Sequence, residues 1–180
     1  PILSCKSYRL SLLVLATASS ALAAEARIPI SGTTTITTPG TYFLSRGLTG
    51  AGPLITVQAD DVVIDLNGFT LTPTSGAGVF ASNFDRVTVR NGFIVGGQSA
   101  VRFEGVEGAR VERIATSGST AAAIHTIDTT ALVVHDTILR NPGGEGVLVN
   151  ASGLAEPAQV EITSNQIVGT GGTGISLKKV

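Results

Sequence analysis

The chain has 180 residues, and 13 aspartates and glutamates balance its 12 lysines and arginines, for a formal net charge of −1. This length predicts one domain. The charge excludes the strongly basic surface by which proteins bind a nucleic acid backbone. The one cysteine, Cys5, has no partner for a disulfide within the chain. We therefore expect a fold that depends on its apolar core, with no nucleic acid as partner.

Residues 1–24 have the order of a secretory signal peptide. Lys6 and Arg9 precede an apolar run at 10–18, and an A-x-A sequence follows at 21–23, as a cleavage site requires. The run is too short to span a bilayer, which takes about 20 residues. We expect cleavage near this sequence and a secreted or periplasmic mature chain that is not held in a membrane. A buried N-terminal helix is the alternative interpretation.

Residues 25–50 are predicted to cover the beginning of the fold that follows. They contain a threonine-rich stretch at 33–38, a turn at Pro39-Gly40 and the apolar sequence Tyr42-Phe43-Leu44. A repetitive β-fold exposes unpaired backbone groups and apolar side chains at each end unless something covers them. We expect this segment to form an N-terminal cap over a repeat domain at 51–180.

From residue 51 the sequence repeats with a period near 23 residues, which is typical of a solenoid. Six triplets with apolar or small outer members and a variable middle member begin, in chain order, at Ile55, Val79, Val101, Ile124, Val147 and Ile175. Their first positions are 24, 22, 23, 23 and 28 residues apart. The long interval contains the sequence NASGLAEPA at 150–158, which we interpret as a surface insertion between coils.

Further short strands with alternating apolar residues lie between the triplets, as at Val62–Ile64 and Val87–Val89. Three short strands in each period leave no room for helices. The repeat therefore predicts an all-β parallel β-helix of about six coils of 22–28 residues, with equivalent strands about 4.8 Å apart. The outer members of each triplet should point inward and the middle members outward. A Gly or Ala before most triplets is expected to allow a sharp turn there.

The segment GTGGTGIS at 169–176 also has the G-x-G-x-x-G spacing of a dinucleotide-binding loop. That motif has meaning only between a strand and a helix, whereas a strand-like triplet follows it here. We interpret Gly171, Gly172 and Gly174 as a corner of the solenoid, and we expect no organic cofactor. Two lysines follow the last triplet, and we expect more coils or a cap beyond Val180.

The segment from Ile36 to Leu71, with PGTYFL and ITVQADDVVIDLNGFTL, resembles the right-handed parallel β-helix repeat proteins of the pectin-lyase-like superfamily, specifically its exported bacterial members. The resemblance covers roughly residues 30–180. It implies a right-handed β-helix and an association with carbohydrate, because the superfamily includes polysaccharide lyases, glycoside hydrolases and sugar epimerases. The superfamily also includes adhesins, so the fold does not fix an activity.

Enzymes of this superfamily work on the outer face of one sheet, so the resemblance directs attention to the outward side chains. The middle members Phe80, Arg102 and His125 should be neighbours on successive coils. An arginine can hold a uronic acid carboxylate, a histidine can move a proton and an aromatic ring can support a sugar face. These three residues are the candidate substrate-binding residues. The alternative interpretation is an ordinary solvated face.

Acidic residues near the turns offer a weaker possibility, a calcium site. Counted from the triplets, Asp61, Asp85 and Glu107 align; counted from the next strand, Asp60 aligns with Asp85 and no third acid follows. Stacked carboxylates can bind calcium, and a solubilising turn is the alternative. The aspartate clusters that the superfamily's pectate lyases and polygalacturonases use are not seen beside the arginine of the outer column. We therefore predict no metal site.

The adjacent pair His135-Asp136 could be an oriented base, but adjacent residues of a strand face opposite ways, so we predict a structural role for it. The sequence thus predicts an exported β-helix associated with carbohydrate, with a polysaccharide or cell-surface glycan as partner. It leaves open whether the protein is a lyase, a hydrolase or no enzyme. The alternative function is a non-catalytic binding or structural module at the cell surface or in the periplasm. The oligomeric state is not predicted.

Overall fold

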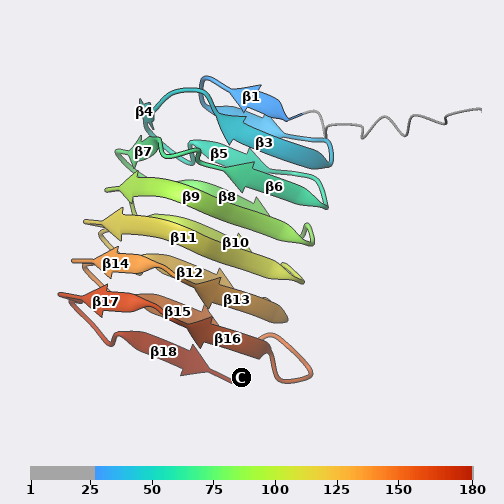
Figure 1. Ribbon diagram of the computed structural model, residues 1–180. Helices are drawn as coiled ribbons and strands as arrows, with labels where there is room; N and C mark the ends of the chain where they lie inside the picture. The colour runs from blue at the N-terminus through green and yellow to red at the C-terminus, as the bar shows by residue number, and fades with distance from the viewer. Residues whose placement is uncertain (1–26, 180) are drawn as a thin grey trace, which may run out of the picture.

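The computed structural model describes residues 27–179, which form a stack of short strands (Figure 1). The predicted leader lies outside the described residues. The strands are β1 (Ile28–Ile30), β2 (Thr34–Ile36), β3 (Gly40–Leu44), β4 (Leu48–Gly50), β5 (Ile55–Val57), β6 (Val62–Asp65), β7 (Thr70–Pro73), β8 (Ala77–Ser82), β9 (Val87–Val95), β10 (Ser99–Glu104), β11 (Ala109–Ser117), β12 (Ile124–Ile127), β13 (Ala131–His135), β14 (Ile138–Arg140), β15 (Val147–Asn150), β16 (Gln159–Thr163), β17 (Gln166–Val168) and β18 (Ile175–Lys178). Residues 27–179 contain no helix that could cross a membrane.

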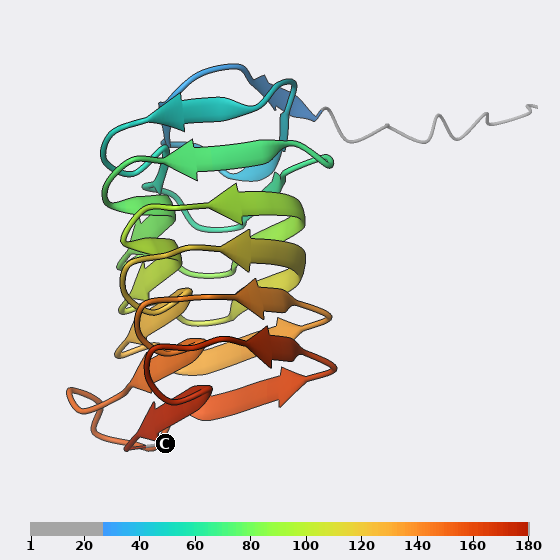
Figure 2. The ribbon, with the colours of Figure 1, turned by 90° about the vertical axis from the view of Figure 1, so that its left-hand side faces the viewer.

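The strands wind into a tube with three faces, as the side view shows (Figure 2). Seven strands form one sheet, here called sheet B, in the order β2-β5-β8-β10-β12-β15-β18. The face called sheet A follows the order β1-β3-β6-β9-β11-β13-β16. The third face consists of β4, β7, β14, β17 and the second halves of β9 and β11. Every pairing between successive coils is parallel, which confirms the predicted all-β parallel solenoid.

The register between coils matches the spacing of the triplets. In sheet B, Val101 is aligned with Val79 on one side and with Ile124 on the other. The same alignment runs from Ile55 to Ile175. Because side chains alternate along a strand, each triplet then places two side chains inside and one outside.

Aligned aliphatic side chains fill the inside of the tube. Val79, Val101, Ile124 and Val147 are fully buried, as is the phenyl ring of Phe103. A fully buried side chain of this kind contributes roughly 1.5–3 kcal/mol to folding. The stability of the stack therefore comes chiefly from columns to which each coil adds the same kind of residue.

The small residues before the triplets have a different cause from the one expected. The φ angle of Gly78 is not in the left-handed region. A Cβ atom added at Gly78 would lie 2.7 Å from Cγ2 of Ile94, inside the tube. A Cβ atom at Gly146 would collide in the same way with Ile167. Small residues are required at these positions because a large side chain from the third face occupies the same space. A bulkier residue would overpack the core there.

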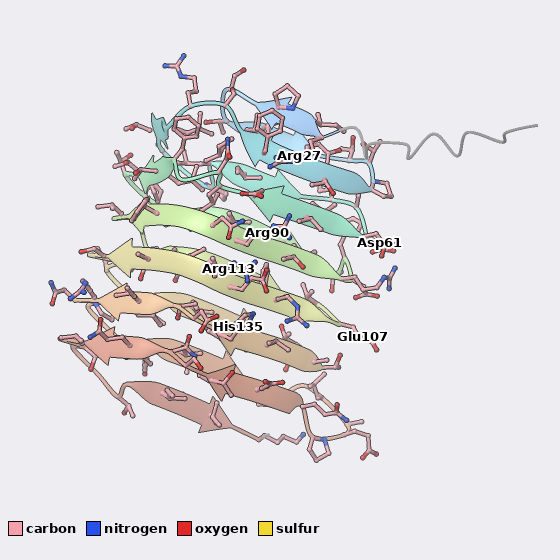
Figure 3. The ribbon with its side chains drawn as sticks, viewed as in Figure 1. Arg27, Asp61, Arg90, Glu107, Arg113 and His135 are labelled. Carbon is pink, nitrogen blue, oxygen red and sulfur yellow. The ribbon has the colours of Figure 1, made fainter. Side chains whose placement is uncertain are left out.

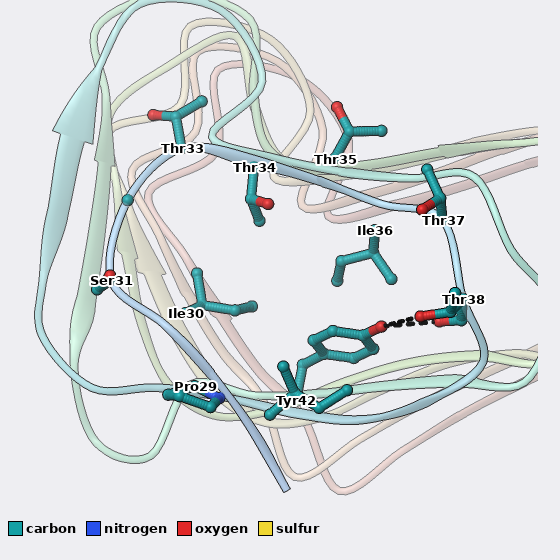
Figure 4. A pocket seen from close by; sticks show the side chains of 12 residues that line it. Pro29, Ile30, Ser31, Thr33, Thr34, Thr35, Ile36, Thr37, Thr38 and Tyr42 are labelled. Carbon is teal, nitrogen blue, oxygen red and sulfur yellow. Dashed lines mark hydrogen bonds between the residues drawn. The ribbon is translucent and has the colours of Figure 1, made fainter.

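The segment expected to be a cap is the first circuit of the solenoid. Its strands β2, β3 and β4 pair in parallel with β5, β6 and β7, because the threonine-rich stretch and Tyr42-Phe43-Leu44 follow the same alternation as later coils. An opening of about 410 Å³ is lined by residues 28–38 and Tyr42. Figure 4 shows the ring of Tyr42 lying in this opening near Ile30 and Ile36. The Tyr42 hydroxyl donates to the carbonyl oxygen of Thr38, at 2.9 Å.

The two irregular stretches of the last coils also lie at corners. The glycine-rich run falls between β17 and β18, as predicted, and there Gly171 donates to the carbonyl of Pro142 and Gly172 to that of Gly144, both at 2.9 Å. A side chain at Gly171 would collide with the backbone of the coil before. The predicted insertion lies between β15 and β16.

Candidate functional site

The three predicted residues of sheet B stack on one another. Arg102 on β10 is aligned with Phe80 on β8 and with His125 on β12, so the three side chains point outward from successive coils. All three are half-buried. The structure therefore brings together the residues that the spacing of the triplets placed together.

Arg102 forms an ion pair with Glu104, which was not among the predicted site residues. Its Nε and Nη2 atoms lie 2.7 and 2.6 Å from Oε1 of Glu104. Both side chains are 30% exposed. Residues two apart on a strand share a face, so the alternation could have revealed this pair. A ligand carboxylate at Arg102 would have to share the guanidinium with Glu104.

His125 lies in an environment that favours its neutral form. Burial lowers the pKa of its imidazole below the ordinary value, and the nearby positive charge of Arg102 lowers it further. A neutral imidazole has one nitrogen that donates and one that accepts. His125 can therefore bind a hydroxyl group or accept a proton near pH 7.

A second cluster of charged side chains lies on the outer face of sheet A. Asp65, Arg90, Glu112 and His135 are aligned on four successive coils. Figure 3 shows Arg27, Arg90 and His135 one below another on this face. Acidic and basic groups thus alternate along the axis, about 4.8 Å apart.

Asp65 anchors the first part of this cluster. Its Oδ2 atom lies 3.2 Å from Nη2 of Arg27 and 3.4 Å from Nε of Arg90. Its Oδ1 atom accepts a hydrogen bond of 2.9 Å from the backbone N–H of Asn67. The side chain is only 10% exposed, and these partners offset the cost of burying its charge.

Glu112 anchors the second part. It accepts a hydrogen bond from Arg113 and lies 2.8 Å from Nε2 of His135 and 3.9 Å from Nη1 of Arg110. Burial favours the neutral carboxyl, but the contacts with His135 and Arg113 outweigh it, and the pKa of Glu112 lies below its ordinary value. Arg113 has a φ angle of 50°, which is uncommon for a large residue.

His135 and Asp136 do contact each other, against the argument from alternation. Nδ1 of His135 lies 3.1 Å from Oδ2 of Asp136, while Nε2 faces Glu112. The reason is that Asp136 has a φ angle of 52°, so the strand bends there and both side chains lie on one side. Both contacts are hydrogen bonds only when each ring nitrogen carries a proton. The arrangement joins two coils and leaves no free ring nitrogen.

The acidic residues considered for calcium are used within the chain. The backbone N–H of Asp85 donates to Asp60, and that of Glu107 donates to Asp85, at 2.8 and 2.9 Å. Asp61 binds Nε of Arg86 at 2.6 Å, which lowers the pKa of the carboxyl and raises that of the guanidinium. The register thus aligns Asp60 with Asp85, in agreement with the count made from the next strand and not with the count made from the triplets. Within residues 27–179, no three His, Cys, Asp or Glu side chains gather as a metal site would need.

Comparison with known protein families agrees with the geometry. Residues 49–179 match the family described as "Right handed beta helix region". The chain belongs to the right-handed β-helix family. No curated protein matched the sequence, and no solved structure did.

Membership of the β-helix family gives the fold and the handedness of the coil, whereas the chemistry has to come from the side chains. In this β-helix, polar groups gather on two outer faces. Sheet B offers an aromatic ring, a guanidinium and a neutral imidazole in a row, and sheet A offers arginines around two buried carboxylates. Both arrangements suit the binding of a polar ligand from solvent.

Proposed function

We propose that this β-helix is an exported carbohydrate-binding domain and that Phe80, Arg102 and His125 on sheet B contact the glycan. The alignment of the three residues on successive coils supports the proposal. Together they cover about 10 Å along the axis, so one linear saccharide lying along the tube can reach all three. The partner would be a polysaccharide or a cell-surface glycan, and the leader pattern supports a secreted or periplasmic location.

The chemistry of the three side chains is complementary to a sugar. An aromatic ring such as Phe80 presents an apolar face to the carbon–hydrogen side of a pyranose. The imidazole of His125 can donate to one hydroxyl group and accept from another. Arg102 can bind the carboxylate of an acidic sugar through the N–H groups that Glu104 leaves free. An acidic glycan is therefore the best candidate ligand.

The test is titration calorimetry of the full chain with oligogalacturonate, with a neutral oligosaccharide for comparison. Arg102→Gln and His125→Gln should each weaken binding about tenfold, as expected for the loss of a hydrogen bond to a charged or buried group. Arg140→Gln removes the same charge from the third face and should bind normally. Equal affinity of all three variants would contradict the assignment to sheet B.

A second candidate function is cleavage of the bound glycan by β-elimination. The lowered pKa of His125 favours it, because a neutral imidazole is ready to accept a proton. His125 would take the proton from the carbon beside the uronate carboxylate. The carbon–oxygen bond to the leaving sugar would break, a carbon–carbon double bond would form and the leaving oxygen would take a proton.

Ultraviolet absorbance of an unsaturated product separates cleavage from binding. A lyase would produce this absorbance with oligogalacturonate and lose it in His125→Gln, while Arg140→Gln would keep it. Binding without any product, with and without calcium, would leave the non-catalytic module as the function. If the chain neither binds oligogalacturonate nor forms a product, a purely structural role for the β-helix is favoured.

A further inference from the structure

A hollow on the outer face of sheet A lies apart from the residues proposed to bind carbohydrate. It measures about 450 Å³ and is lined by Arg27, Thr41, Val63, Asp65 and Arg90. Arg27 precedes β1, and the others come from β3, β6 and β9. The parallel register places Thr41 beside Val63, and Asp65 beside Arg90. Three neighbouring coils thus build its wall.

The one acidic group in the hollow is already engaged. In addition to the two arginines and the backbone N–H of Asn67, Asp65 lies 3.3 Å from Nδ2 of Asn91. The carboxylate is 10% exposed and is surrounded by two hydrogen bonds, from Asn67 and Asn91, and by ion pairs with the two arginines. Asp65 therefore fixes the positions of the two arginines and is largely covered by its own neighbours.

The two arginines, in contrast, keep most of their donors. A guanidinium carries five N–H groups. Arg86, Arg102 and Arg113 each donate at least one hydrogen bond to a side chain of this chain. Within the described part of the chain, the only acidic group that Arg27 and Arg90 meet is Asp65, at ion-pair distance. Their side chains are 44% and 33% exposed, so the terminal N–H groups can meet a ligand from solvent, although Nε of Arg90 itself is buried.

Arg27 is also held in place by an aromatic ring, that of Phe43. Its guanidinium carbon lies 4.9 Å from the centroid of the Phe43 ring, a distance typical of a cation–π contact. Phe43 is aligned with Asp65, so the ring and the carboxylate hold Arg27 from adjacent coils. A guanidinium that is positioned in advance loses less conformational entropy when a ligand binds.

We propose that this hollow binds the oxyanion group, carboxylate or sulfate, of an acidic saccharide. Arg27 and Arg90 donate to its oxygens, and the Thr41 hydroxyl is available for an adjoining polar group. With two positive groups and one negative group, the hollow carries a net positive charge. Paired guanidinium groups favour an anion with two or more oxygens. The oxyanion site is argued from these contacts alone, whereas the saccharide that would carry the oxyanion rests on the proposed function.

The experiment is titration calorimetry of the full chain with oligogalacturonate, a sulfated oligosaccharide and inorganic sulfate. Arg27→Gln should weaken saccharide binding about tenfold or more, as should Arg90→Lys, which keeps the charge but not the planar fork. Arg140→Gln, with the same loss of charge on the third face, should have no effect. Thermal unfolding of each variant shows that the fold is intact.

The outcomes decide between the sources of the oxyanion and between the two faces. Tighter binding of oligogalacturonate assigns a carboxylate, and tighter binding of the sulfated saccharide assigns a sulfate ester. Inorganic sulfate that binds as tightly as either saccharide would overturn the saccharide part of the proposal. Binding that Arg102→Gln weakens, but Arg27→Gln and Arg90→Lys do not, would overturn this site while supporting the one on sheet B.

Discussion

The outer faces of sheets A and B carry similar charged groups in different surroundings. On sheet A, the carboxylates of Asp65 and Glu112 are each 10% exposed and each meet several cationic groups. On sheet B, Arg102 and Glu104 form one pair, and both side chains are 30% exposed. A charge that is removed from water destabilises the fold when its partners are lost, whereas an exposed pair contributes little.

This difference separates the buried acids of sheet A, which should contribute to stability, from the more exposed groups of sheet B. The acids of sheet A connect successive coils, so their removal should first affect folding. The groups of sheet B lie along the surface, so their removal should first affect a ligand. Variants on the two faces can therefore be compared in pairs, because the same chemical change should have different consequences.

The largest effect on stability is expected for Asp65→Ala. This change leaves the backbone N–H of Asn67 without its acceptor and two arginines without their anchor, at a cost of about 2 kcal/mol, or about 5 °C in Tm. Glu104→Ala on sheet B should cost less than about 1 kcal/mol. Thermal unfolding by circular dichroism measures both. Equal losses would show that burial does not distinguish the two faces.

Unfolding at acid pH should reveal how much Glu112 contributes to stability. Its folded pKa is lower than its ordinary value of 4.5, so the unfolded chain takes up the proton first as pH falls. The stabilisation is complete above the ordinary value and is lost as pH falls through the folded pKa. Unfolding followed from about pH 6 to about pH 3 should therefore show a shallower loss in Glu112→Gln than in the wild-type protein. Parallel curves would contradict this role.

The titration of His125 should produce a smaller loss of stability than that of Glu112, and at higher pH. Its folded pKa is below the ordinary value of 6.5 because of burial and Arg102, so the unfolded state again binds the proton more readily. Stability should decline as pH falls from about 8 towards the folded pKa, and His125→Gln should remove that part of the decline. The same titration in Glu112→Gln should keep it. A flat wild-type curve in this range would argue against the buried, neutral imidazole.

The smallest effect is expected at the corner between the two sheets. Asp61 and Arg86 form a close pair, but their side chains are 57% and 56% exposed. Solvent and salt screen such a pair, so Asp61→Asn should leave Tm unchanged within the error of measurement. A loss as large as that of Asp65→Ala would mean that this corner holds the coils together.

The spacing of the triplets was sufficient to predict the solenoid and the outer column of sheet B. Alternation fixes which face a side chain takes, and a constant period fixes its neighbour on the next coil. Phe80, Arg102 and His125 could therefore be placed together without a structure. The same two rules, applied to the residue two positions on, would also have found Glu104.

The same period also aligns the column of sheet A, because Asp65, Arg90, Glu112 and His135 are 25, 22 and 23 residues apart, but its individual contacts could not be predicted. The contact between His135 and Asp136 depends on a left-handed φ at Asp136, which simple alternation does not include. Arg113 adopts the same conformation although its residue type rarely does. Backbone conformation at the corners decides which charges meet; residue type indicates it at an aspartate such as Asp136, but not at Arg113.

The segment between β15 and β16 has a practical use. Residues 152–157 leave the stack and return to it, yet Ile127 still aligns with Asn150 before them, and Ala131 with Gln159 after them. Ala155 and Glu156 at its outer part are exposed. A fluorophore, an affinity tag or a whole reporter domain introduced there would project sideways from the rod. Such a fusion would allow both surfaces that are proposed to bind a saccharide to be assayed in a labelled protein.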